Sequence, residues 1–287
     1  MLIALVATVL AILVAQLLPA AQWRQRLLAW WPRWLAASAG QSAWGWLASL
    51  ALPMLLLGLL QWLTRDWLYG TVAVLLGVAV LVLSWGPRDL ERDVEALVYA
   101  DDGPTREQAR QALYSDGLDE DPIAPPLAQA VAVALLRRAL GVLFWFLVLG
   151  PVGAFGYRLL ASQAIAGQPL SAAARERLRG VLAVVEWPVA QLAVLSFALM
   201  GNLNGVLAAW QAQGRWRALE VEPLLGAAMA GGLPEARGGD VGELEGAEAV
   251  PLWERAPVLR EAMHLSWRTV GLWCGLMAFW VLASWLG

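Results

Sequence analysis

Long apolar stretches recur along the chain and are separated by short charged segments. About 20 apolar residues in a helix cross the hydrocarbon core of a bilayer, and stretches of roughly that length are repeated here. The pattern therefore predicts an all-α, polytopic integral membrane protein with about six transmembrane helices. The predicted spans are residues 2–18, 43–63, 67–85, 139–157, 181–210 and 270–286.

The fourth span follows from two adjacent arginines. Nineteen residues without a formal charge, 139–157, separate Arg137 and Arg138 from Arg158, and as a helix they cover roughly 28 Å. Placing both adjacent arginines at mid-bilayer would cost about 5–7 kcal/mol on insertion scales. We therefore interpret the three arginines as markers of the membrane boundary, and residues 127–136 as a half-helix at the interface.

Between the spans, three segments have a distinct character within what we expect to be a single membrane domain over 1–287. Residues 22–37 repeat tryptophan and leucine on one helical face, which predicts an interfacial helix. Residues 86–126 carry 11 acidic side chains and four arginines, and predict a cytoplasmic acidic helical hairpin whose second helix begins with a capping box at Thr105–Gln108. Residues 211–262 form a Gly-rich loop that we interpret as a flexible linker.

Arginine counting gives the orientation. Under six spans, 15 of the 20 arginines lie on the side of the long loops and five on the other. The positive-inside rule then places the long loops in the cytoplasm and both termini in the periplasm. Many of the 18 tryptophans lie at predicted span ends, as expected for side chains that prefer the membrane interface.

Composition supports the membrane class and excludes several chemistries. The chain is 60% hydrophobic and 15% charged, with a mean hydropathy of +0.59, too little polar surface for a soluble globule of 287 residues. A net charge of −3 without a basic tract argues against nucleic acid as a partner. One cysteine, one histidine and no lysine exclude an intramolecular disulfide, a P-loop and a two-histidine zinc site. We accordingly expect no catalytic constellation, no metal site and no cofactor.

Two motifs resemble a known family. "LFWFLVLGPVGAFGYRLL" from Leu143 and "VLAVVEWPVAQLAVLSFALMGN" from Val181 resemble paired motifs of the AmpE family and of its relatives, the CobD/CbiB cobalamin-biosynthesis proteins. The AmpE resemblance implies a non-enzymatic regulatory protein of the bacterial inner membrane. Such proteins are linked to an AmpD-type cell-wall amidase and to β-lactamase induction in response to muropeptides.

The alternative within this resemblance is an amide-forming corrinoid synthase, adenosylcobinamide-phosphate synthase-like. Relatives of that branch carry an acidic stretch ahead of the Phe-Trp span, and the matching positions here are Val133, Ala134 and Arg137. Gln191 stands where an arginine is frequent. Because carboxylates normally hold the magnesium and place the phosphates of a nucleotide, their loss favours the AmpE branch.

The candidate ligand-binding residues combine both lines of reasoning: Arg137, Arg138, Glu186, Tyr157, Arg158 and Gln191. An ionisable group inside a span, such as Glu186, is a functional candidate, although pairing with a nearby arginine such as Arg179 explains it as well. Membrane lipids are expected partners of the chain. Two guanidiniums at the mouth of a cavity would in addition suit an anionic ligand, which could be a muropeptide or a lipid headgroup. The alternative is that both arginines only mark topology.

The orientation is testable by thiol labelling in intact cells. Cysteines introduced at Ser115 and Gly239 should resist membrane-impermeant reagents because both loops are predicted to be cytoplasmic, whereas a cysteine at Ser171 should react. Labelling of a cysteine at position 115 would overturn the orientation.

Overall fold

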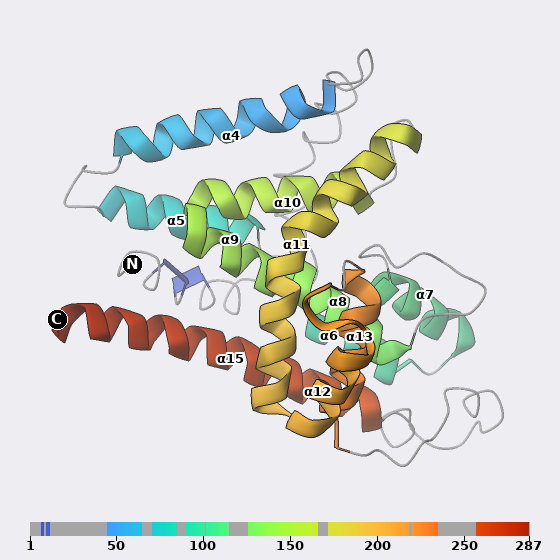
Figure 1. The fold of residues 1–287 in the computed structure, drawn as a ribbon. Helices are drawn as coiled ribbons and strands as arrows, with labels where there is room; N and C mark the ends of the chain where they lie inside the picture. The colour runs from blue at the N-terminus through green and yellow to red at the C-terminus, as the bar shows by residue number, and fades with distance from the viewer. Residues whose placement is uncertain are drawn as a thin grey trace. The chain divides into compact units, whose positions relative to one another are not determined.

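The computed structural model describes the chain in ten segments and divides it into two compact units (Figure 1). In the described segments all regular structure is helical, which confirms the all-α class. The first unit comprises 1–87, 138–185 and 273–287, and the second comprises 88–137 and 186–272. The described residues are 7–8, 10–11, 45–64, 71–84, 90–100, 102–114, 126–165, 172–217, 220–234 and 257–286.

Four helices of the described residues lie wholly within the first unit: α4 (Gly45–Thr64), α5 (Thr71–Ser84), α9 (Gly141–Leu149) and α10 (Pro151–Ile165). The helices predicted at 43–63 and 67–85 correspond to α4 and α5. Helix α10 packs against α4, α5 and α9 (Figure 1). Its buried alanines and leucines contribute to one continuous apolar core. Such small and branched side chains let helices pack closely without leaving voids.

The prediction of a single span over 139–157 is wrong. Helix α8 (Leu127–Leu135) runs through a π-helical segment, η2 (Leu136–Leu140), directly into α9. The chain then turns at Gly150, whose φ of 70° is open to glycine at little cost, and Pro151 begins α10. The span was predicted from the number of residues without a formal charge, and that number gives no signal for a turn. The prediction that 127–136 form a separate half-helix came from the same count and is also wrong.

Glycines allow the hairpin of α9 and α10 to close tightly. A Cβ at Gly153 would lie 2.1 Å from the carbonyl oxygen of Trp145, and one at Gly141 would lie 2.3 Å from the Tyr157 ring. Gln61 of α4 accepts a hydrogen bond of 3.4 Å from the backbone N–H of Val152 at the start of α10. The motif around "GPVGAFGY" is thus explained by helix packing.

In the second unit, the acidic segment contains the predicted helical hairpin. Its helices are α6 (Leu90–Val98) and α7 (Gly103–Tyr114), which pack against each other. The predicted capping box is wrong, because α7 begins at Gly103 and the Thr105 N–H donates to Asp102 Oδ1 at 3.0 Å. The side-chain and backbone hydrogen bonds of Thr105 hold the pKa of Asp102 below its ordinary value.

The fifth predicted span also differs from the structure. Helix α11 (Ala172–Met200) starts earlier than expected and ends at Met200. Asn202 then caps a separate helix, α12 (Leu203–Ala212), by accepting from the Gly205 N–H at 3.2 Å. Asparagine is among the best N-cap residues, so it ends one helix and begins the next. The last predicted span, 270–286, lies within a helix, α15 (Pro257–Leu286).

The Gly-rich segment 211–262 is not all loop. It contains a 3₁₀ turn, η3 (Arg215–Arg217), and an apolar helix, α13 (Val221–Gly232), whose residues are largely buried. Helix α13 crosses α12 where both helices carry glycines. A Cβ at Gly205 would lie 2.1 Å from the Gly231 carbonyl oxygen. Beside this crossing, the Asn202 N–H donates to the Gly232 carbonyl oxygen at 2.9 Å. The prediction of a flexible linker therefore fails for these residues.

Two helices of the described residues are long and apolar enough to cross a membrane, Leu127–Leu149 and Arg175–Met200. Two shorter apolar stretches, Leu50–Thr64 and Thr71–Ser84, accompany them. The interfacial helix predicted at 22–37, most of the first span and residues 235–256 lie outside the described residues.

The glycine crossing of α12 and α13 predicts that Gly205→Ala is destabilising. Its methyl group must displace the Gly231 carbonyl, which is backbone and cannot rotate away, so we expect a loss of about 1–3 kcal/mol in thermal unfolding. Gly271→Ala is the matched control, because nothing lies within 4 Å of its added methyl group. This control should be neutral or stabilising by up to about 1 kcal/mol. Equal stability of the two variants would contradict the crossing.

Candidate functional site

A buried arginine is the centre of the candidate site. Arg137 lies in η2, and 7% of its side chain is exposed. Because the helix extends from Leu127 to Leu149, this residue is near its middle, so the prediction that a helix begins just after Arg137 and Arg138 is wrong. The π-helical turn that carries it is an insertion of a kind often found at functional sites.

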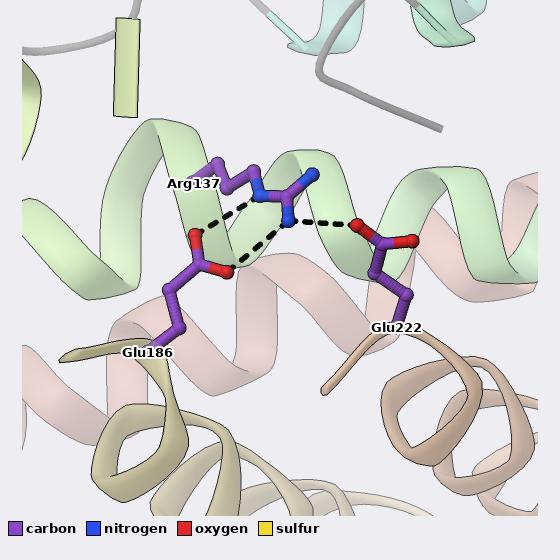
Figure 2. Close-up of polar contacts among 3 residues, drawn as sticks. All are labelled: Arg137, Glu186 and Glu222. Atoms are coloured by element: carbon purple, nitrogen blue, oxygen red, sulfur yellow. Dashed lines mark hydrogen bonds and ion pairs between the residues drawn. The ribbon is translucent and has the colours of Figure 1, made fainter. Parts of the chain in front are cut away.

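Glu186 of α11 is the main partner of this arginine. Arg137 Nε donates to Glu186 Oε1 at 2.9 Å, and Arg137 Nη2 donates to Glu186 Oε2 at 3.2 Å (Figure 2). The two parallel bonds form a bidentate pair, the strongest common geometry between these groups. Only 1% of the Glu186 side chain is exposed. Glu186 is thus paired with an arginine, Arg137, 49 positions away along the chain, while its role in ligand binding stays a prediction.

A third charged residue, Glu222, completes the cluster and was missed by the sequence analysis. Its Oε1 accepts from Arg137 Nη2 at 2.8 Å, and Figure 2 shows its carboxylate reaching the guanidinium from α13. Unlike Glu186, it remains 34% exposed. The signal was present in "EVEPLLGAAMAGG", where an acidic residue and a proline precede an apolar run, as at a helix start.

Burial determines what this cluster contributes. A charge removed from water is strongly destabilising unless an opposite charge and hydrogen bonds replace its hydration. Arg137 and Glu186 satisfy each other, and Glu222 adds a second negative charge beside one positive charge. The three residues connect η2, α11 and α13 within the second unit.

Gln191 is buried in a different environment on α11. Its Oε1 accepts from the indole N–H of Trp210 at 3.0 Å, and its Nε2 donates to the Arg215 carbonyl at 3.4 Å. Trp210 stacks edge-on against Trp216, with ring centroids 5.1 Å apart. Gln191 therefore fixes the chain after α12, where Arg215 adopts a left-handed φ of 57°.

The remaining candidates belong to the first unit. Tyr157 is buried, and its ring lies against Gly141 of α9. Arg138 is also buried, so it does not mark a helix end either, while Arg158 is half-buried on α10. The packing of Tyr157 explains its place in the motif without a ligand.

In the part of the chain that the structure describes, few side chains are candidates for metal binding or acid–base chemistry. No group of three or more His, Cys, Asp and Glu side chains gathers there in a way that could hold a metal ion. His264 lies exposed on α15. The arrangement around Arg137 is suited to binding or exchanging carboxylates.

The chain matches no family model, no curated protein and no solved structure. The resemblance to the AmpE and CobD/CbiB proteins consequently depends on the quoted motifs alone.

The Arg137–Glu186 pair predicts a strongly non-additive double-mutant cycle. Arg137→Gln leaves the buried Glu186 carboxylate without its counter-charge and should cost about 3–5 kcal/mol of stability. Arg137→Gln combined with Glu186→Gln removes both charges and should cost less than Arg137→Gln alone. Thermal unfolding of the detergent-solubilised protein measures both.

The exposed pair Arg110–Glu107, at 3.0 Å, provides the matched control for this cycle. Its coupling energy should be at most about 0.5 kcal/mol, as is usual for exposed helical pairs. Simple additivity of the Arg137 and Glu186 substitutions would contradict the buried pair.

Proposed function

We propose that this chain is a multi-pass protein of the bacterial inner membrane with a non-enzymatic regulatory or accessory role of AmpE type. The proposal rests on the identity of residue 137, which is an arginine, and on its two carboxylate partners. This residue occupies a position where the synthase-like relatives are expected to carry an acid, and here it is neutralised by Glu186 and Glu222.

The charge at this position argues against nucleotide activation. A magnesium-nucleotide site needs free carboxylate oxygens around the metal and cations around the phosphates. Glu186 is almost fully buried and both of its oxygens bind Arg137, so its carboxylate is committed to the protein itself. A structural or signalling use of the cluster is consistent with this arrangement.

Membrane residence is supported by the outer face of α4. Leucines recur there at helical spacing and are exposed, with Leu55 at 70%. An aqueous surface rarely carries such a continuous apolar stripe, whereas lipid chains cover it without cost. The exposed leucines of this stripe are Leu52, Leu55, Leu56, Leu59, Leu60 and Leu63.

The proposed partners are membrane lipids, an anionic ligand such as a muropeptide or a headgroup, and a functional link to an AmpD-type amidase. Regulation through the membrane would require only that ligand binding change the arrangement of the helices. The charged cluster provides a group of contacts that an anion can alter.

Deletion of the gene tests the proposal against its alternative. In a host with an inducible β-lactamase, we expect the deletion to change induction by a β-lactam and to leave growth without added cobalamin unaffected. A plasmid copy of the wild-type gene should restore induction. Unchanged induction together with a cobalamin requirement would overturn the regulatory assignment and support the corrinoid synthase.

A further inference from the structure

The two carboxylates on Arg137 differ in how firmly they are held. Glu186 makes two hydrogen bonds to the guanidinium and is almost completely buried, whereas Glu222 makes one and is 34% exposed. A bidentate buried contact is costly to break, because two charge-assisted hydrogen bonds between desolvated groups are lost at once. The single contact of Glu222 can be exchanged for water or for another anion at much lower cost.

From this asymmetry we infer that Glu222 occupies an oxyanion-binding position whose fixed part is Arg137 held by Glu186. A carboxylate or phosphate group of a ligand takes the place of the Glu222 carboxylate on Arg137 Nη2. This inference rests on the anionic ligand of the proposed function and deepens it by naming the binding position, but it does not depend on the AmpE assignment. It follows from the geometry of three residues.

Exchange at this position conserves charge. Replacing one carboxylate with a singly charged oxyanion leaves the charge at the guanidinium unchanged, so no additional buried charge has to be created. The Arg137 fork remains oriented throughout by Glu186, whose two bonds fix the plane of the guanidinium. An incoming oxyanion therefore meets a preorganised donor, which lowers the entropy cost of binding.

Glu222 acts in this scheme as an internal competitor. It lies at the start of α13 and is attached to the chain, so its effective concentration at Arg137 is high and a ligand must displace it. Release of Glu222 breaks the contact that it makes between α13 and η2. Ligand binding is thereby coupled to the attachment of α13 within the second unit.

The test uses the full-length protein in phosphatidylcholine nanodiscs, with inorganic phosphate as the probe. Thermal unfolding is followed as phosphate replaces chloride at constant ionic strength. Glu222→Gln removes the competing charge, so phosphate should stabilise this variant with an apparent affinity at least about tenfold tighter than in wild type. Glu107→Gln, which removes an exposed carboxylate from another ion pair, should behave as wild type.

A second substitution shows whether the gain depends on Arg137. Arg137→Lys keeps the positive charge that Glu186 needs for folding, but an ammonium group cannot hold two carboxylates in the fork geometry. In the Glu222→Gln background, it should abolish the tenfold gain. Equal phosphate affinity of Glu222→Gln and wild type, or an undiminished gain with Arg137→Lys, would overturn the inference.

Replacing phosphatidylcholine with phosphatidylglycerol distinguishes the source of the oxyanion. Selective stabilisation of Glu222→Gln over Glu107→Gln by phosphatidylglycerol would indicate a lipid phosphate. Stabilisation by dissolved phosphate alone would indicate a soluble ligand. Absence of both effects would refute the oxyanion position, while gene deletion continues to test the regulatory assignment separately.

Discussion

The buried pair between Arg137 and Glu186 constrains the rest of the second unit. A guanidinium among apolar helices is tolerated only when a carboxylate and its hydrogen bonds replace water. The π-helical turn of η2 presents Arg137, and α11 presents Glu186 with both oxygens directed at it (Figure 2). Any arrangement that separates these two residues breaks two charge-assisted hydrogen bonds between buried groups, so the pair favours packings that keep η2 and α11 together at this point.

Close backbone approaches provide the second constraint, and they occur in both units. Gly153 admits the Trp145 carbonyl between α9 and α10, and Gly205 admits the Gly231 carbonyl between α12 and α13. At such crossings dispersion and weak Cα–H contacts replace side-chain packing, a means of association suited to helices surrounded by lipid. The motif that suggests the AmpE family is explained largely by the first of these crossings, so its residues describe a fold more than a reaction.

The charged cluster relates this architecture to function. Glu186 is held by two buried hydrogen bonds, whereas Glu222 is partly exposed, and under the inference above this difference would make the Arg137 cluster responsive to other anions. Small changes in which carboxylate binds Nη2 would change how α13 is held. A regulatory protein requires such a contact between a ligand and a helix, whereas a synthase would require carboxylates that remain free for metal and phosphate.

The sequence alone determined the helical class, the positions of α4 and α5 and the presence of the acidic hairpin. It also singled out Arg137 and Glu186 as charged residues within apolar stretches. Hydrophobic periodicity and isolated charges are local signals, so both can be read without the tertiary structure. Only the tertiary structure decided that the helix before Arg137 is continuous, that the chain turns at Gly150, and that Glu222 joins the cluster from a segment interpreted as a linker. The two carboxylates of the cluster lie 49 and 85 positions away from Arg137. Nothing in local spacing encodes which distant carboxylate will neutralise a buried guanidinium, because that choice depends on how the helices pack.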